Sequence, residues 1–418
     1  MPREGLESLV SPYVGVVRGV QEVLAGPQDI RLATMWCESA HAGALLGVET
    51  AHTGGGSGSS AAEAHAAAIG EAVERYSACY LDEERLVVAT ARELGPRAVD
   101  PHRFALFSDE QYRRRGFPYV RFTRDTRLAW IEGRSLPDGR PALLPAQLVH
   151  LVSPPGEPRI GRATSSGLAC HTSAERATLS AFLEVLERDA FMITWKTQLS
   201  WPRLDWSGDP ALERFVRTRV RPTGLRVRAI DLSAFWDVPC VLGVARSRVQ
   251  GDAPLGVGAA AAPTIERAVQ KALDEAVRVR SWAHALRSAR VPLPADIRDF
   301  DDHVRFYAEP AHAGRAAFLD ASHERRRVRE IAPLAPADRL GQLCERLERR
   351  SASAYAVELT APDVRDAGLA VTRVMAPELC ALDVEHAAPL LGGRRLYEEP
   401  VRLGFDPRPI NPDPHPFP

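Results

Sequence analysis

Three long helical segments separated by β-like runs are the strongest constraint on the fold of this chain. Alanine, leucine, glutamate and arginine at helical spacing predict helices over 61–80, 174–195 and 263–290. Short runs rich in Val, Leu and aromatic residues, broken by Gly and Pro, predict strands within 92–155 and 202–249. Helical and β-rich segments therefore alternate, which indicates an α+β fold with helices packed on β-sheets.

The 418 residues contain no long linker, so one composite domain is expected. A β-rich part covers 1–60 and ends in the run TGGGSGSS at 53–60, which predicts a flexible loop with free backbone amides. The three helices define a core over 61–290, followed by a C-terminal α/β part over 291–408. A proline-rich tail occupies 409–418, where neither a helix nor a central strand is possible.

The charge balance excludes several classes of partner. A formal net charge of -1 and a pI of about 6.9 give no electrostatic footprint for nucleic acid or an anionic membrane. No run approaches the roughly 18 apolar residues of a membrane span, and the N-terminus lacks the features of a signal peptide, so a cytoplasmic location is expected. The six cysteines form no CxxC pair and are expected to be small buried hydrophobic residues.

Lysine is nearly absent, and this restricts how the chain could bind a nucleotide. Neither Lys196 nor Lys271 follows a glycine, whereas a phosphate-binding P-loop requires a Gly-Lys pair. Any ATP site must therefore be of another kind. Lys196 is expected to snorkel at the surface, and Trp195, Trp201 and Trp206 are expected to pack in the interior, since no basic patch accompanies them in the sequence.

The pattern ExxER occurs on two of the predicted helices. It is formed by Glu71, Glu74 and Arg75 on one helix, and by Glu184, Glu187 and Arg188 on the other. At 100° per residue, Ser180, Glu184 and Glu187 fall within about 60° of one another. Either motif alone is more commonly explained by Glu–Arg salt bridges that stabilise a solvent-exposed helix face. Two such motifs facing each other would supply four carboxylates, the ligands that Mg²⁺ prefers when it also binds phosphate.

These segments resemble the signatures of the YcaO family. GGGSGSSAAEAHAAAIGEAVERYSA is similar to the first signature, a Gly-rich loop followed by SxxExxER, with Ala68 in the serine position. The second signature, SxxxExxER, is matched by Ser180, Glu184, Glu187, Arg188 and Asp189. ERAVQKALDEAVRVRSW is similar to a third nucleotide-site helix, with Glu275 and Arg280 in register and Arg278 where glutamine is common. The resemblance extends from about Ser11 to Pro418, with the signatures in the family's order.

The resemblance implies a YcaO-type fold around an ATP cleft without a P-loop. Its implied Mg²⁺ ligands are Glu71, Glu74, Glu184 and Glu187. The residues implied to contact ATP are these four together with Arg75, Ser180, Arg188, Glu275, Arg278 and Arg280. The implied activity is that of a peptide cyclodehydratase, in which a Cys, Ser or Thr side chain of a ribosomal precursor peptide attacks the preceding amide carbonyl. The former amide oxygen then attacks ATP and leaves with phosphate, giving a thiazoline or (methyl)oxazoline.

The last residues, NPDPHPFP, resemble the PxPxP ending of azoline-forming members. The resemblance implies a catalytic tail containing Pro414, His415, Pro416 and Pro418, with the terminal carboxylate orienting the substrate or accepting a proton. Alternating prolines lower the entropy cost of docking such a tail. The alternatives are a disordered tail or a polyproline ligand for another domain.

Family resemblance also implies partners: a precursor peptide, an E1-like or other leader-binding protein, a flavin dehydrogenase and a second copy in a homodimer. Two other functions stay open, namely formation of a backbone thioamide or amidine, and a non-catalytic YcaO-like protein that binds nucleotide or peptide. Cys170 beside His171 could suggest a nucleophile and its base, but no third orienting group is visible. A loop or core role is therefore expected for this pair.

Overall fold

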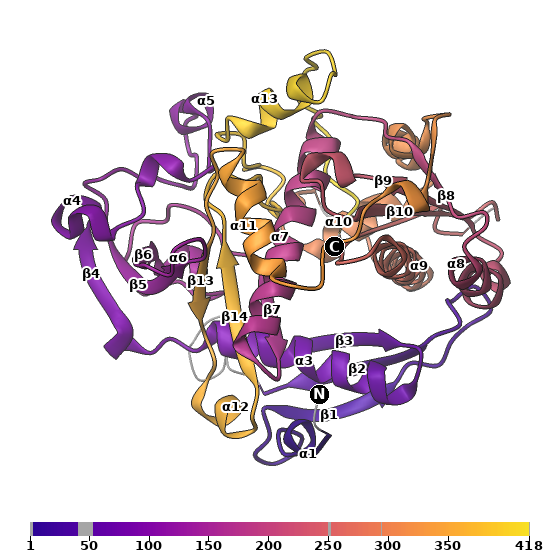
Figure 1. The fold of residues 1–418 in the computed structure, drawn as a ribbon, viewed down its shortest axis with the longest axis horizontal. Coiled ribbons are helices and arrows are strands. Elements are labelled where there is room, and N and C mark those ends of the chain that lie inside the picture. The colour runs from indigo at the N-terminus through magenta and orange to yellow at the C-terminus, as the bar shows by residue number, and fades with distance from the viewer. Residues whose placement is uncertain (1–2, 41–52, 250–251, 294, 418) are drawn as a thin grey trace. The chain divides into compact units, whose positions relative to one another are not determined.

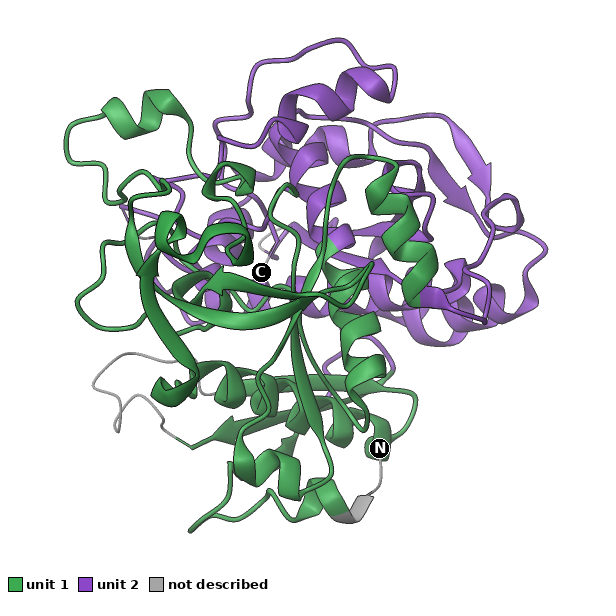
Figure 2. Ribbon diagram, turned by 60° about the vertical axis from the view of Figure 1, so that its left-hand side comes forward, with its two compact units in different colours: residues 1–24, 32–185, 340–379 green, residues 25–31, 186–339, 380–418 purple. Residues whose placement is uncertain are grey.

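The computed structural model describes residues 3–40, 53–249, 252–293 and 295–417. The chain divides into two compact units, each assembled from separate stretches of sequence (Figure 2). Unit 1 comprises 1–24, 32–185 and 340–379, and unit 2 comprises 25–31, 186–339 and 380–418. The boundary near residue 185 falls within the long helix α7, Ala174–Lys196.

Unit 1 combines two sheets with the helix α3, Ala61–Cys79 (Figure 1). The first sheet has the order β1-β2-β3 and is antiparallel, with β1 at Val17–Glu22, β2 at Ala33–Ser39 and β3 at Thr53–Gly58. The second sheet has the order β4-β5-β13-β14-β7, with β6 paired to β5. Its strands are β4 Leu86–Thr90, β5 Arg127–Ser135, β6 Pro141–Pro145, β7 Leu168–His171, β13 Tyr355–Glu358 and β14 Ala370–Met375. The core of this unit joins α3 to apolar side chains of both sheets.

The other helical segments of unit 1 are short. They are α1 Arg3–Glu7, α4 Ala91–Leu94, α5 Asp109–Arg113, α6 Ala146–Val149, α12 Pro362–Asp366 and the single turns η1 Glu83–Arg85, η2 Gly95–Arg97 and η3 Pro101–Arg103. A longer helix, α11 at Arg339–Glu348, begins at the boundary between the units.

Unit 2 is built on one sheet of order β11-β10-β9-β8-β12, in which only the β12–β8 pair is parallel among the described strands. Its strands are β8 Arg203–Asp205, β9 Arg226–Asp231, β10 Cys240–Arg246, β11 Leu255–Ala261 and β12 Arg325–Arg327. Its helical segments are α8 Pro210–Phe215, η4 Val216–Val220, η5 Arg221–Thr223, η6 Ser233–Phe235, α9 Ile265–Ser288, α10 Phe300–Ala308, η7 Ala313–Asp320, η8 Val328–Glu330 and α13 Arg395–Arg402. The long helix α9 packs on β10 and β11, and α10 packs against α9.

The three predicted long helices are present as α3, α7 and α9, and hydroxyl caps explain where two of them begin. The Ser60 hydroxyl accepts from the Glu63 amide, and the Thr264 hydroxyl accepts from the Arg267 amide. The expected sheet region over 92–155 is only partly β. YVRF at 119–122 is irregular, and in ALLPAQLVHLV the strand β6 ends at Pro145 and is followed by the short helix α6. The two real strands there, β5 and β6, form a hairpin.

The prediction of a flexible loop for the Gly-rich run at 53–60 is wrong, because most of this run forms a strand. Residues 53–58 form β3, paired in register with β2. The glycines are required by packing: a Cβ on Gly56 would lie 2.3 Å from the amide nitrogen of Ala68 on α3, and one on Gly54 would lie 2.6 Å from the carbonyl oxygen of Ala68. Glycine thus allows close approach of strand and helix, a role that composition alone does not distinguish from flexibility.

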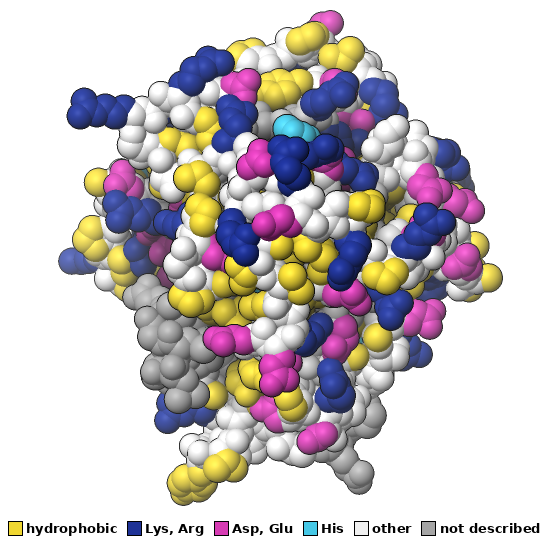
Figure 3. All heavy atoms as spheres, turned by 90° about the vertical axis from the view of Figure 1, so that its left-hand side faces the viewer, with side chains coloured by type: hydrophobic (Ala, Val, Ile, Leu, Met, Phe, Trp, Pro, Cys, Tyr) yellow, Lys and Arg dark blue, Asp and Glu magenta, His cyan; other side chains and the backbone are white. Residues whose placement is uncertain are grey.

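All six cysteines are free and buried, as predicted; they are Cys37, Cys79, Cys170, Cys240, Cys344 and Cys380. On the face drawn in Figure 3, acidic and basic side chains are interspersed, in keeping with the near-zero net charge. Among the described residues, no helix has the length and apolarity needed to cross a membrane.

Candidate functional site

The first ExxER motif lies on α3 and is tied to the Gly-rich strand β3. Glu71 accepts a hydrogen bond from the amide of Gly55 at 2.6 Å, and its other carboxylate oxygen pairs with Arg75 at 2.6 Å. Arg75 also donates to the carbonyl of Thr53. The glycine strand therefore supplies a backbone donor to the carboxylate of a helix residue. The amide of Gly55 is thus engaged, whereas free amides were predicted from the sequence.

Glu74 faces the second sheet of unit 1. Its carboxylate accepts from the amide of Cys170 on β7 at 2.7 Å. Burial raises the pKa of Glu74 well above its ordinary value, and the negative charges of Glu184 and Glu71 raise it further. Three of the four predicted metal-binding carboxylates thus interact electrostatically within unit 1. Two cations lie near these carboxylates. Arg75 opposes the pKa shift of Glu74, and the buried Arg373, whose pKa burial lowers to about 10, interacts with Glu184.

The fourth carboxylate, Glu187, lies in unit 2 beside β11. It is buried, accepts from the amide of Ala261 at 3.0 Å, and pairs with Arg188 at 2.8 Å. Glu275 on α9 accepts from the amide of Ala259 on the same strand at 2.8 Å. Burial raises the pKa of Glu275 to about 7, with Arg188 opposing the shift and Glu187 adding to it. Strand β11 therefore holds two carboxylates through its backbone amides.

The β3–α3 and β11–α9 pairs use the same construction. In each pair, a strand amide donates to a helix glutamate 16 residues later, from Gly55 to Glu71 and from Ala259 to Glu275. Glycines on both strands allow the helix to approach, since a Cβ on Gly256 would lie 2.2 Å from the carbonyl oxygen of Ala276. The two glutamates are thus fixed by backbone geometry rather than by chance side-chain packing.

These carboxylates fit a divalent cation with phosphate ligands. Desolvated carboxylates that repel one another have raised pKa values because their charged forms are disfavoured, and a cation between them removes that penalty. No group of three or more His, Cys, Asp or Glu side chains in the described part of the chain makes a metal site unaided. Mg²⁺ at nucleotide sites needs only one or two carboxylates, because phosphates and water supply its other ligands.

The remaining residues predicted to contact ATP have mixed surroundings. Ser180 is exposed, and Arg278 pairs with Asp274 one helical turn away at 3.4 Å. Arg280 is fully buried, forms an ion pair with Asp252 and donates to Gln28 at 2.5 Å. The guanidinium of Arg280 is therefore already engaged in the core. A contact of Arg280 with phosphate stays a prediction, and such a contact would have to replace the ion pair with Asp252.

Two positions near the motifs have structural explanations. Ala68, where the family pattern has serine, is fully buried beneath β3, and the thiol of Cys37 donates to its carbonyl at 3.1 Å. Cys170 is buried on β7, and burial raises the pKa of its thiol. His171 accepts from the amide of Thr172 at 2.8 Å. The arrangement supports a core role for Cys170 rather than a nucleophile activated by His171.

The proline-rich tail is docked inside unit 2. The carbonyl of Pro414 accepts from the hydroxyl of Tyr307 at 2.7 Å, and His415 stacks on His303 with ring centroids 3.9 Å apart. Phe417 is fully buried and lies under the guanidinium of Arg188, which is 4.2 Å from the ring centroid. The tail is therefore ordered, and a disordered extension is excluded for 411–417. Pro418, the predicted catalytic terminus, lies outside the described residues.

His415 has the properties of a neutral core side chain. It is fully buried, and its Nε2 lies 2.5 Å from the carbonyl oxygen of Asp383. Burial lowers the pKa of His415 well below its ordinary value, and His303 lowers it further. The ring is thus suited to holding the tail in place.

The anchor of the tail was not predicted from the sequence, and the surface position predicted for Lys196 is wrong. Lys196 is buried, not at the surface, and pairs with the equally buried Asp383 at 3.1 Å. The amide of Asn411 donates to the Lys196 carbonyl, so the end of α7 holds the start of the tail. Nothing in the local sequence identifies Asp383 as the partner, because it is distant in the chain. The tryptophan prediction is confirmed for Trp195 and Trp201, which are buried.

Comparison with known families gives one match that covers most of the chain. Residues 55–380 match the model of the YcaO cyclodehydratases, described as ATP- and Mg²⁺-binding. A protein of Methanothermobacter thermautotrophicus described as uncharacterized is 29% identical over 232 residues, which are 54% of this chain and 56% of that protein. The chain therefore aligns with little more than half of this relative.

Solved structures share the fold. A heterocyclase in complex with substrate and cofactor has a TM-score of 0.82 at 24% identity, over 99% of this chain and 57% of that one. YcaO from Methanopyrus kandleri, bound with AMPPCP and Mg²⁺, has a TM-score of 0.62 at 20% identity, over 89% and 88%. The Escherichia coli microcin synthetase complex McbBCD with pro-MccB17 bound has a TM-score of 0.63 at 13% identity, over 86% and 88%. At these identities the likeness establishes the α+β fold alone.

Proposed function

Because the chain belongs to the YcaO cyclodehydratase family, whose members bind ATP and Mg²⁺, we propose that it is an ATP-dependent peptide cyclodehydratase. Its substrates would be Cys, Ser or Thr residues of a ribosomal precursor peptide, and its products thiazoline or (methyl)oxazoline rings. The observation that carries this proposal is the set of half-buried or buried carboxylates on α3, α7 and α9, in which neighbouring negative charges raise the pKa of Glu74 and of Glu275. Such groups are costly to keep unless a ligand uses them.

The Mg²⁺ ligands that we propose from the family signatures are Glu71, Glu74, Glu184 and Glu187. Arg75, Ser180, Arg188, Glu275, Arg278 and Arg280 are proposed to contact the nucleotide. Bound ATP supplies the activation of the amide oxygen, and the protein supplies positioning and neutralisation of the phosphate charge. No covalent nucleophile is needed, in agreement with the buried state of Cys170.

The tail is proposed to position the reacting peptide. Pro414, His415 and Pro416 form the ordered stem, and Pro418 would present its carboxylate near the reacting amide. Support comes from the contacts of the stem with His303 and Tyr307, and from the contact of Phe417 with Arg188, a residue of the second signature. The tail therefore contacts Arg188, one of the residues proposed to bind the nucleotide, and both lie in unit 2.

Partners follow from the same proposal. The heterocyclase named above is solved with substrate, and the McbBCD complex with pro-MccB17. We therefore expect a precursor peptide as the substrate and an E1-like or other leader-binding protein as a separate partner. A flavin dehydrogenase that oxidises azolines to azoles and a homodimeric assembly are further expectations from the family.

The direct test is ATP-dependent loss of water from the precursor peptide, followed by mass spectrometry. Glu187→Gln should abolish ATP consumption and ring formation while circular dichroism stays native, because an amide cannot replace a carboxylate on Mg²⁺. Glu175→Gln, on the exposed first turn of the same helix, is the matched control and should keep normal activity. Normal turnover by a folded Glu184→Gln/Glu187→Gln variant would remove both residues from the site. A product in which sulfur replaces one backbone oxygen, or a dehydrated product that fragmentation identifies as an amidine rather than an azoline, would instead support the alternative YcaO chemistry.

A further inference from the structure

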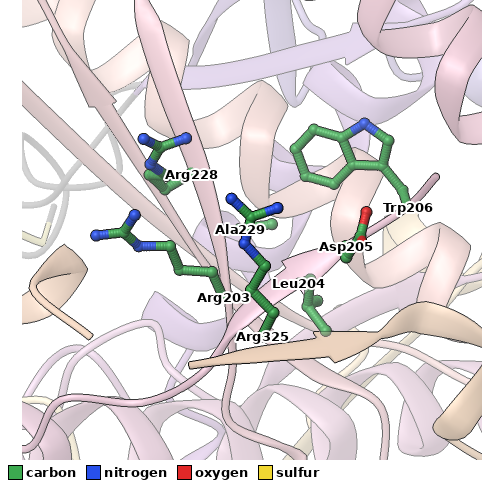
Figure 4. A pocket seen from close by; sticks show the side chains of 7 residues that line it. All are labelled: Arg203, Leu204, Asp205, Trp206, Arg228, Ala229 and Arg325. Carbon is green, nitrogen blue, oxygen red and sulfur yellow. The ribbon is translucent and has the colours of Figure 1, made fainter. Parts of the chain in front are cut away.

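A cavity of about 220 Å³ lies within unit 2, where the strands β8, β9 and β12 meet (Figure 4). Arg203 from β8, Arg228 from β9 and Arg325 from β12 line it together with Asp205 and Trp206. None of these residues belongs to the family signatures or to the tail. The cavity is therefore separate from the carboxylates assigned to ATP.

The three guanidinium groups lack carboxylate partners among the described residues. Asp320, the nearby acid, is already paired with Arg246 at 2.7 Å and with Arg226 at 3.2 Å. Arg203 donates to the backbone carbonyl of Asp320 at 2.7 Å. Within the described part of the chain, three cations thus share one cavity without an ion pair.

The local surroundings also leave these cations short of other acceptors. The Asp205 carboxylate, which lines the same cavity, accepts from the amide and the hydroxyl of Ser207. The Nε atoms of Arg203 and Arg228 are buried without a hydrogen-bond partner in the described structure. Burial lowers the pKa of Arg228, the charges of Arg203, Arg226 and Arg325 lower it further, and Asp320 opposes the shift only in part. An anion in the cavity would relieve both the repulsion and the missing hydrogen bonds.

We propose that this cavity binds a phosphate group. Three arginines and Asp205 leave a charge of about +2, which a phosphate dianion balances and a single carboxylate balances only by half. Guanidinium forks also match the geometry of phosphate oxygens. In Figure 4 the indole of Trp206 stands beside the arginines, so a flat ring attached to the phosphate could stack on it. The phosphate could therefore be inorganic or part of a nucleotide.

The test is calorimetric titration of the full chain with inorganic phosphate and, separately, with AMP, in Mg²⁺-free buffer at low ionic strength. Arg228→Gln should weaken phosphate binding at least tenfold. Arg217→Gln, an exposed arginine of η4 outside the cavity, should bind phosphate as the wild type does. Glu187→Gln should also bind normally, because the cavity does not use the proposed ATP site.

The two sources of phosphate are separated by Trp206→Leu, which removes the aromatic ring. If AMP binds more tightly than phosphate and this substitution removes the advantage, a nucleotide is the ligand; if AMP has no advantage, free phosphate is. Wild-type phosphate affinity in folded Arg228→Gln and Arg203→Gln variants would overturn the proposal, as would binding that is lost only in Glu187→Gln. Neither result would bear on the cyclodehydratase activity, which is measured separately with peptide.

Discussion

At the scale of single residues, Glu275 shows how the proposed site stores unfavourable charge. Its folded-state pKa of about 7 exceeds the unfolded value of about 4.3, so the folded state binds more protons between these values. Stability from this group is therefore present at low pH and lost as the pH rises toward 7. Above that pH the buried carboxylate is charged and destabilises the ligand-free protein.

Glu275→Gln should therefore stabilise the ligand-free protein at pH 8, raising Tm by about 2–4 °C, and should flatten the dependence of Tm on pH between 5 and 8. The same change should weaken binding of ATP with Mg²⁺. Scanning calorimetry across this pH range measures the first effect, with Glu266→Gln in the first turn of α9 as the control. Identical pH profiles for wild type and Glu275→Gln would show that the carboxylate carries no such penalty.

Side-chain identity was the most predictable part of the site, and side-chain partners were the least. Spacing on a helix placed Glu71 and Glu74 correctly on α3, because helical geometry is local. The surface position predicted for Lys196 was wrong because a lysine can be buried when it has an acidic partner, and its partner Asp383 lies far along the chain. Long-range pairing of this kind leaves no local pattern.

At the scale of elements, the strand β3 packs closely on α3, although its Gly-rich composition suggested a flexible loop. Gly56→Ala should destabilise the protein by about 3 kcal/mol or more, since its Cβ would meet backbone atoms of α3 that cannot move aside. Gly19→Ala on β1 is the control, because its Cβ would meet nothing within 4 Å. Urea unfolding midpoints report the difference. Equal midpoints for the two variants would contradict the packing role given to the Gly-rich strand.

The tail is the second element whose role can be isolated. Deleting 415–418 should suppress ring formation by orders of magnitude, but it also removes the buried His415 and Phe417 and so confounds function with stability. Adding two glycines after Pro418 keeps the buried stem and displaces only the terminal carboxylate. This extension should lower ring formation at least a hundredfold, with Tm unchanged and nucleotide affinity within a fewfold. Normal cyclisation by the extended protein would leave the tail with a packing role only.

Helices were more predictable than strands, for a physical reason. The segments α3, α7 and α9 carry their signal in local spacing and in caps such as Thr264. Strand pairing is decided by distant neighbours: β12 comes more than a hundred residues after β8, yet the two pair in parallel. The run at 119–122 has β-like composition and forms no strand, since composition does not provide a pairing partner.

At the scale of the whole molecule, the two units are each built from separate stretches of the chain, and this interleaving could not be anticipated from sequence. The prediction of a single composite domain rested on the missing linker. The family signatures fall in both units, with Glu71, Glu74 and Glu184 in one and Glu187 and Glu275 in the other.

If ATP activates a peptide amide, the oxygen of that amide must leave with phosphate, and an isotope label on this oxygen follows the step itself. A precursor peptide labelled with ¹⁸O at the reacting amide is incubated with the protein, the proposed leader-binding partner, ATP and Mg²⁺, and the released phosphate is examined by mass spectrometry. The account predicts one labelled oxygen in phosphate for each ring formed, and no label with Glu187→Gln. Ring formation that leaves the phosphate unlabelled would contradict the claim.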